Sequence, residues 1–226
     1  MSFKKLSKIY HYIRCIPKTL LFNFYYLPFN QAIKFPILIN HRTKFVQLRG
    51  RITIPNSAKT GKIKLGFGRV QIADNKYSRL IWNVGKRGEV HLGEHIKLGT
   101  GSRLHIEGKL VVGCESNFTG ETTIICNQEI IFGRECLVSW HTLFMDSDLH
   151  QITDRSNAIL NPDKTIKIED KVWIGARSTI TKGVHIGKES VVASSATVSK
   201  NFPNYSVIGG NPASLIGDFT GKQFKR

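Results

Sequence analysis

The sequence predicts an all-β solenoid: a left-handed parallel β-helix of hexapeptide repeats, with a short N-terminal helical lead and a short C-terminal tail. The first observation is a run of aliphatic residues spaced six apart, and the second is a weaker repeat of three glycines spaced twenty apart. A helix repeats every 3.6 residues and a strand every two, so neither element alone explains an aliphatic residue at each sixth position. The aliphatic positions are Ile168, Ile174, Ile180, Ile186, Val192 and Val198, and the glycines are Gly93, Gly113 and Gly133.

A triangular cross-section accounts for the six-residue period. Three flat sides of six residues make a coil of about 18 residues, and successive coils stack at the strand spacing of about 4.8 Å. The aliphatic side chain points into the narrow interior, where the small residues Ser178, Ser190 and Ala196 also fit. Glycine permits unusual backbone conformations near the corners. The twenty-residue spacing then corresponds to about 18 residues plus two at one corner, and the coiling must be left-handed, an exception to the right-handed crossover rule.

Residues 1–45 are predicted to form a basic amphipathic helical lead. The chain has 226 residues and a formal net charge of +17, and residues 1–90 alone hold 18 Lys or Arg against 2 Asp or Glu. Apolar residues at helical spacing predict a helix up to Pro17 and a second short helix up to Pro28. This apolar stripe either packs against the solenoid or lies on an anionic membrane surface, and the two alternatives can coexist. The stripe consists of Phe3, Leu6, Tyr10, Ile13 and Leu20.

Residues 46–217 are expected to form the β-helix, and residues 218–226 the tail. No apolar run approaches the roughly 20 residues that span a bilayer, and the N-terminus lacks the apolar core and cleavage site of a signal peptide. The cysteines form no CxxC pair, which favours a reducing compartment. We therefore expect a cytoplasmic protein, either free or peripheral at the inner membrane face. The cysteines are Cys15, Cys114, Cys126 and Cys136.

The repeats stop after Val138, and a polar loop of about residues 140–165 precedes their return at Ile168. A long polar excursion from a regular solenoid is more often functional than accidental. Its titratable residues include two histidines and two neighbouring aspartates. The aspartates either hydrogen-bond a ligand or a catalytic imidazole, or they only hold a turn. These residues are His141, His150, Asp146 and Asp148.

The C-terminal repeats carry a family resemblance in the run DKVWIGARSTITKGVHIGKESVVASSATVSKNFPNYSVIGGNPASLIG. This run resembles the hexapeptide-repeat acyltransferases, above all the galactoside, maltose and xenobiotic acetyltransferases and the O-acetyltransferases of bacterial surface polysaccharides. The resemblance extends over residues 90–217. It implies transfer of an acetyl group from acetyl-CoA to a sugar hydroxyl in a homotrimer with three equivalent sites.

The same resemblance implies roles for residues in the loop. The family's catalytic base is a histidine some two dozen residues before the WIG motif, a position that His150 occupies, 23 residues before Trp173. Imidazole has an ordinary pKa of about 6.5 and suits removal of a hydroxyl proton near neutral pH. Asp148 is expected to orient this imidazole. Asp146, His141 and Trp140 are expected to contact the sugar.

Cofactor contacts carry over position by position, in a groove between neighbouring subunits. The expected CoA contacts are Trp173, Ala176, Ser194, Ser199 and Lys200, the lysine facing the phosphates. The family usually has a basic residue after its NPA turn, but this sequence has Ser214, which leaves the adenosine-phosphate contacts open. No metal is expected.

Two other classes of function remain open. The same solenoid builds metal hydratases of the gamma carbonic anhydrase type, and His105 and His141 have a spacing close to that of two of their ligands, although position 146 is Asp rather than a third histidine. The basic lead could instead make the chain a non-enzymatic membrane-binding or nucleic-acid-binding module. No nucleic-acid motif accompanies the basic residues, so nucleic acid is not the expected partner.

Overall fold

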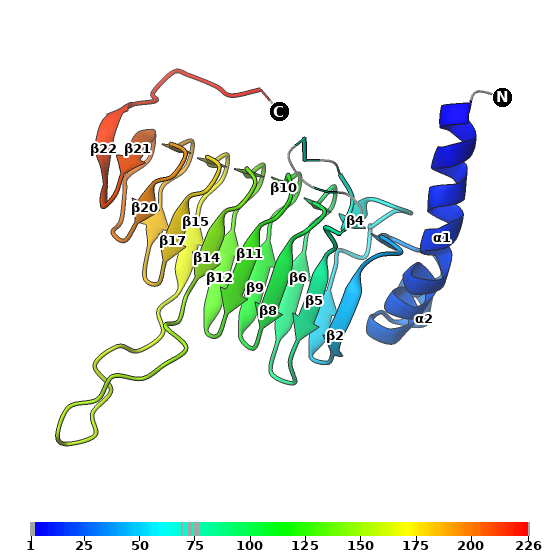
Figure 1. The fold of residues 1–226 in the computed structure, drawn as a ribbon, viewed down its shortest axis with the longest axis horizontal. Helices are drawn as coiled ribbons and strands as arrows, with labels where there is room; N and C mark the ends of the chain where they lie inside the picture. Colours follow the sequence, from blue (N-terminus) through cyan, green and yellow to red (C-terminus); the bar gives the residue numbers. More distant parts are fainter. Residues whose placement is uncertain (1–2, 69, 72–73, 75–76, 226) are drawn as a thin grey trace.

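The chain forms three parallel sheets that run along the faces of a prism (Figure 1). The computed structural model describes residues 3–68, 70–71, 74 and 77–225. Each coil contributes one strand to each sheet in turn, so that the sheets contain nine, seven and six strands. The chain passes from the first to the second sheet at what we call the first corner, from the second to the third at the second corner, and back to the first at the third corner.

The strands of each sheet have the following bounds. The first sheet contains β1 (Ile37–Ile39), β4 (Ile63–Leu65), β7 (Lys97–Leu98), β10 (Asn117–Phe118), β13 (Leu137–Val138), β16 (Trp173–Ile174), β19 (Val191–Val192), β21 (Ser206–Gly210) and β22 (Ala213–Asp218). The second contains β2 (Lys44–Leu48), β5 (Ile81–Val84), β8 (Arg103–Ile106), β11 (Thr123–Cys126), β14 (Leu143–Met145), β17 (Thr179–Thr181) and β20 (Thr197–Val198). The third contains β3 (Arg51–Thr53), β6 (Glu89–Leu92), β9 (Lys109–Val112), β12 (Glu129–Phe132), β15 (Ile166–Ile168) and β18 (His185–Ile186).

The predicted left-handed β-helix is confirmed, and the six aliphatic positions form its interior. All six are 0% exposed, and the small residues Ser178, Ser190 and Ala196 are buried beside them. A side chain that points into so narrow a prism is enclosed by all three sheets, so each interior residue loses nearly all of its contact with water. The burial of apolar surface at every sixth position is therefore what holds the coils together.

Strand register explains both repeat lengths. Trp173 pairs with Val191, eighteen residues later, whereas Asn117 pairs with Leu137, twenty residues later. The two extra residues lie at the second corner of the upstream coils, since the interior residues on either side of it, Ile124 and Phe132, are eight positions apart instead of six. The prediction of a coil with an enlarged corner is thus confirmed.

The glycines of the twenty-residue repeat are not explained by unusual backbone conformations, as we expected, but by close packing between coils. They lie at the third corner without a positive φ angle. A Cβ atom on Gly113 would lie 2.4 Å from the carbonyl oxygen of Gly133 in the next coil. These glycines are therefore needed for close stacking of the coils rather than for backbone freedom.

A single long helix covers the N-terminal end of the prism, followed by a short one. Helix α1 (Phe3–Tyr26) continues through Pro17, which corrects the predicted break, and α2 (Phe29–Ala32) follows it. Asn23 Nδ2 donates to the carbonyl oxygen of Ile37 at 2.7 Å, and the Ile39 amide donates to Thr19 Oγ1 at 3.1 Å. These side chains satisfy the open edge of β1, so α1 protects the first coil from unwanted strand pairing.

The face of α1 that packs on the prism is not the predicted apolar stripe. Cys15, Thr19, Phe22 and Asn23 are buried. Of the predicted stripe, Leu6, Tyr10, Ile13 and Leu20 are exposed, and the side chain of Phe3 lies outside the described part of the structure. None of the described helices has the length and hydrophobicity needed to cross a membrane.

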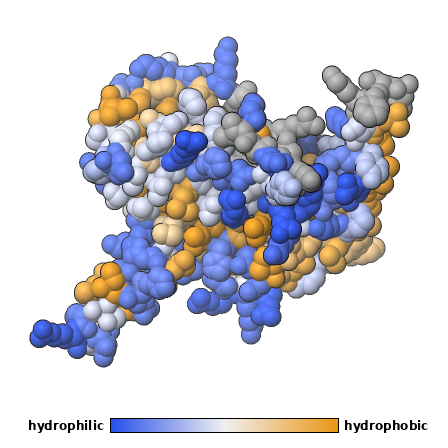
Figure 2. All heavy atoms as spheres, in the orientation of Figure 1, coloured by the Kyte–Doolittle hydropathy of each residue, from blue (hydrophilic) through white to orange (hydrophobic). Residues whose placement is uncertain are grey.

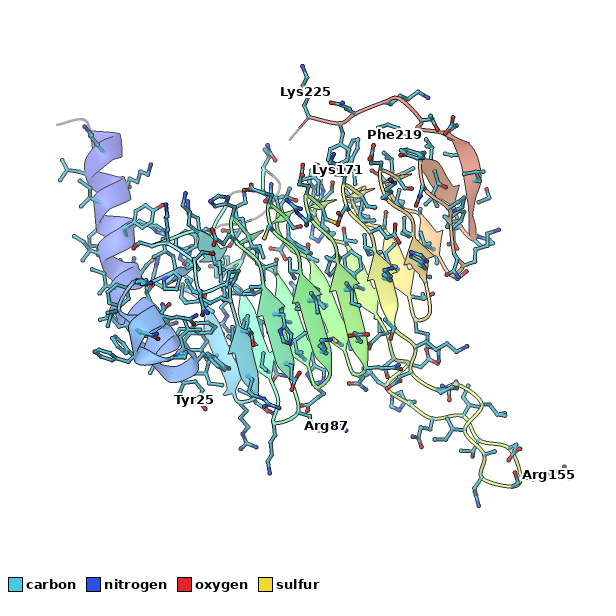
Figure 3. All side chains as sticks on the ribbon, turned by 180° about the vertical axis from the view of Figure 1, so that it is seen from behind. Tyr25, Arg87, Arg155, Lys171, Phe219 and Lys225 are labelled. Carbon is cyan, nitrogen blue, oxygen red and sulfur yellow. The ribbon has the colours of Figure 1, made fainter. Side chains whose placement is uncertain are left out.

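The sheet begins at Ile37, before the boundary that we placed after residue 45. At the other end, β21 and β22 form an antiparallel pair that closes the first sheet. The tail then turns back along the coils, where Figure 3 shows Phe219 and Lys225 on the same side as Lys171. The four cysteines are free.

Candidate active site

The polar loop forms an arm that projects from the second corner. We call residues 146–165 the arm; it lies between β14 and β15, at the corner that already holds the two extra residues upstream. Figure 1 shows it extending away from the prism, and Figure 3 places Arg155 at its tip. Thr153 and Ile159 form an antiparallel bridge across it. The arm therefore has internal structure of its own.

His150 lies in the N-terminal half of the arm and is exposed. Its carbonyl oxygen accepts a hydrogen bond of 2.8 Å from Nδ2 of Asn161, on the returning half. The Ile152 amide donates to Oδ1 of the same asparagine at 2.6 Å. Asn161 thus ties the two halves together and fixes the backbone from which the imidazole projects.

Asp148 fixes the base of the arm rather than the imidazole. Lys182 Nζ donates to Asp148 Oδ2 at 2.6 Å and to the carbonyl oxygen of Asn161 at 2.9 Å, and Asn161 Nδ2 donates to Asp148 Oδ2 at 2.8 Å. The hydrogen bond from Lys182, and then that from Asn161, holds the pKa of Asp148 below its usual range. Among the described residues, Asp148 makes no hydrogen bond to His150, so the structure replaces the predicted orienting contact with a Lys182–Asp148–Asn161 clamp.

Asp146 is a structural residue. Its carboxylate is 0% exposed and accepts backbone hydrogen bonds from Asn127 at 2.7 Å, Gln128 at 2.9 Å and Glu129 at 2.8 Å. The first two amides belong to the enlarged corner of the preceding coil, and the third belongs to the first residue of β12. Because the carboxylate is enclosed and fully engaged, this placement argues against the sugar contact that the sequence predicts for Asp146.

Trp140 and His141 lie at the first corner, at the other end of β14 from the arm. His141 is exposed with a φ of 57°, and Trp140 is half-buried. Three strand residues, at about 3.3 Å each, separate this corner from the arm. One chain therefore does not gather these two residues around His150.

The predicted cofactor residues divide between two edges of the second sheet. Ala176 and Ser194 are stacked at the first corner, where the Ser195 amide donates to the Ala176 carbonyl oxygen at 2.8 Å. Ser199 and Lys200 are exposed at the second corner, on the same side of the prism as the arm.

Trp173 faces outward from the first sheet and lies near the first-corner group. Its Nε1 donates to Ser139 Oγ at 3.1 Å, and its ring lies 5.9 Å from that of Phe224 in the tail. A site that uses His150 together with Trp173, Ala176 and Ser194 therefore needs two chains.

Sequence reasoning missed Lys182 and Asn161. Lys182 follows β17 as Asp146 follows β14, so the coil register could have placed it at the second corner beside the arm. Asn161 has no periodic signal, because it lies within the arm.

Comparison with known proteins agrees with the geometry. The family model of the bacterial transferase hexapeptide (six repeats) matches residues 165–200. The galactoside O-acetyltransferase of Lactococcus lactis subsp. lactis is 27% identical over 133 residues, which cover 59% of this chain and 58% of that protein. An Escherichia coli protein named as a lipopolysaccharide biosynthesis O-acetyl transferase is 26% identical over 141 residues, 57% of this chain and 71% of that protein.

Among solved structures, the polysialic acid specific acetyltransferase NeuO matches with a TM-score of 0.55 and 19% identity, over 84% of this chain and 89% of that chain. The chain spans little more than half the length of the galactoside enzyme, and the structural match bears on the fold alone. The matched repeats and the three-sheet prism show that the chain contains hexapeptide repeats and has the left-handed β-helix fold.

Proposed function

We propose that this chain transfers an acetyl group from acetyl-CoA to a sugar hydroxyl of a bacterial surface polysaccharide or its precursor. The observation that carries the proposal is an exposed histidine on a clamped arm, a twenty-residue insertion between β14 and β15. The similarity to sugar O-acetyltransferases supports the same class of reaction.

In the proposed reaction, the imidazole of His150 acts as general base. It takes the proton of the sugar hydroxyl as the hydroxyl oxygen attacks the carbonyl carbon of the thioester. Backbone N–H groups of a neighbouring coil stabilise the negative charge on the tetrahedral oxygen. The carbon–sulfur bond then breaks, and the CoA thiolate leaves and takes the proton from the imidazolium. In this proposal the transfer is direct, since no cysteine lies on the arm, and Cys15, which does lie beside two histidines, is on α1 at the N-terminal end of the prism.

A homotrimer supplies the complete site in this proposal. The predicted cofactor residues lie partly at the first corner and partly at the second, so the arm of one chain would face the first corner of the next. The arm carries exposed apolar side chains that its own prism does not cover, and a neighbouring chain would cover them. These side chains are Leu149, Ile152, Ile159 and Leu160.

The proposal is tested by incubating the purified protein with acetyl-CoA and saccharides isolated from the producing bacterium. We expect free CoA and a saccharide heavier by one acetyl group, with the group on oxygen and removable by mild base. Saccharides that stay unmodified while the protein hydrates carbon dioxide would support the carbonic anhydrase alternative instead.

That alternative has little support in the geometry. Nδ1 of His105 lies 2.9 Å from Nδ2 of Asn83 on the second sheet, and His141 is at the first corner. Neither histidine belongs to a cluster of metal-ligating groups among the described residues. The basic lead packs on the end of the prism, where Asn23 Nδ2 donates to the carbonyl oxygen of Ile37 at 2.7 Å.

The N-terminal helix gives the enzyme a membrane-facing end in this proposal. Its outward residues are apolar, basic residues flank them, and the sequence has no acidic residue before Asp74. Figure 2 shows hydrophobic residues along the outer side of α1 and α2. Such a helix suits an anionic lipid surface, where lipid-linked saccharides are held. The enzyme would then work at the inner face of the membrane.

We expect the protein to sediment with phosphatidylglycerol vesicles but not with phosphatidylcholine vesicles. A double variant in which Asp replaces both Ile9 and Ile13 should bind the vesicles about tenfold more weakly. Two exposed apolar side chains of α1 no longer enter the lipid interface in this variant. The double replacement of Leu215 and Ile216 by Asp is the matched control, since these residues are 57% and 60% exposed at the far end of the prism. Equal binding by all three proteins would remove the membrane role from α1.

A further inference from the structure

We propose that His11, Cys15 and His41 bind a transition-metal ion of the zinc class, which fastens α1 to the first coil. Sγ of Cys15 lies 3.9 Å from Nε2 of His11 and 3.9 Å from Nδ1 of His41. One ligand atom of each residue lies within 4.8 Å of the other two. It is the one such cluster of three or more metal-ligating side chains in the described part of the chain.

The backbone brings these side chains together for different reasons. His11 and Cys15 are four residues apart on α1, so they share a helix face. His41 comes from the turn between β1 and β2, on which that face packs. A tetrahedral zinc ion with bonds of about 2.3 Å to sulfur and 2.0–2.1 Å to nitrogen holds these atoms about 3.6 Å apart. The two sulfur–nitrogen distances therefore need to shorten by only about 0.3 Å.

The chemical types of the three ligands indicate which class of metal ion would bind. One thiolate and two imidazoles suit zinc, cobalt and copper, and exclude magnesium and calcium, which prefer oxygen. Cys15 is buried and both histidines are half-buried. The rings of Tyr12 and Phe67 pack against His11 and limit the space around the ion.

The charges around the cluster act in two directions. Arg14, Lys18 and Arg42 are close to His41 and disfavour a bare dication. Burial raises the pKa of the Cys15 thiol, and a bound ion would displace that proton. The resulting thiolate offsets one of the two charges of the ion.

The site is separate from the proposed acyl transfer. Figure 1 shows α1 at the N-terminal end of the prism, whereas the arm leaves it several coils further on. The ion would strengthen the contact that protects the edge of β1, so its expected effect is on stability.

Titration of the metal-free protein with Co²⁺ tests this site. We expect a cobalt–thiolate charge-transfer band in the near ultraviolet that saturates at one Co²⁺ per chain and disappears when Zn²⁺ is added. Zn²⁺ should also raise the melting temperature. Cys15→Ser should abolish the band, and His41→Gln should weaken Co²⁺ binding at least about tenfold.

Cys114→Ser is the matched control, because Cys114 lies outside the cluster. This variant should keep the band and the Zn²⁺-dependent stabilisation. His11→Gln serves the same test as Cys15→Ser at a half-buried position. A wild-type protein without the band, or a band that survives in both Cys15→Ser and His11→Gln, would overturn the proposal.

Discussion

We expect alanine in place of His150 to lower kcat for the proposed acetyl transfer by about 10²–10⁴-fold, the range that general base catalysis supplies. The sugar hydroxyl then attacks the thioester without a group to take its proton. Because His150 is exposed and its side chain supports no neighbouring element, the variant should fold normally and bind acetyl-CoA with nearly unchanged affinity. Steady-state kinetics together with calorimetric titration of acetyl-CoA separate these two effects.

His105→Gln is the control for this experiment. His105 contacts Asn83 on the second sheet and has no role in the proposed transfer, so kcat should stay within a factor of a few of wild type. The carbonic anhydrase alternative predicts acetyl transfer by none of these proteins, with carbon dioxide hydration lost in His105→Gln and retained in His150→Ala. Near-normal acetyl transfer by His150→Ala would remove this residue from the mechanism.

Asp146→Ala lowers the free energy of unfolding by about 3–5 kcal/mol, as expected when one partner of a buried charged network is removed. Three backbone amides of the preceding coil, those of Asn127, Gln128 and Glu129, lose their acceptor. Asp146→Asn should lower the free energy of unfolding by less, because the amide oxygen of Asn still accepts hydrogen bonds from some of these backbone amides. Urea unfolding followed by circular dichroism measures both changes.

Asp148→Asn is the contrasting variant. Asp148 is exposed, and its partners Lys182 and Asn161 can turn to water, so its unfolding midpoint should stay close to that of wild type. If Asp146→Ala were as stable as wild type and instead bound the saccharide more weakly, the ligand contact predicted from the sequence would be correct and the structural role wrong.

The repeats were predictable because their cause is local and periodic. An interior position such as Ile180 recurs every six residues, and the sequence shows that period directly. Helix α1 was harder, because nearly every turn carries apolar residues. The side chains of Asn23 and Thr19 hydrogen-bond the edge of β1 and so determine which face of α1 is buried. The spacing of apolar residues in the helix does not reveal this contact.

The site was only partly predictable for the same reason. The position of His150 follows from a family resemblance and from the interruption of the repeats. The sequence cannot tell that Asp146 turns inward while Asp148 turns outward, because this depends on which amides of the preceding corner lack partners. Nor does it place Lys182, which reaches the arm only once the coils are stacked.

The central claim is that each active site combines the arm of one chain with the first corner of another, and co-assembly of two inactive variants tests it most directly. His150→Ala removes the base, and Ala176→Trp fills the proposed cofactor groove. In trimers mixed at random from equal amounts of the two variants, half of the arms and half of the grooves are intact. About one site in four then combines an intact arm with an intact groove, so the mixed protein should recover about a quarter of wild-type activity. Activity no higher than that of either variant alone would contradict a site shared between chains.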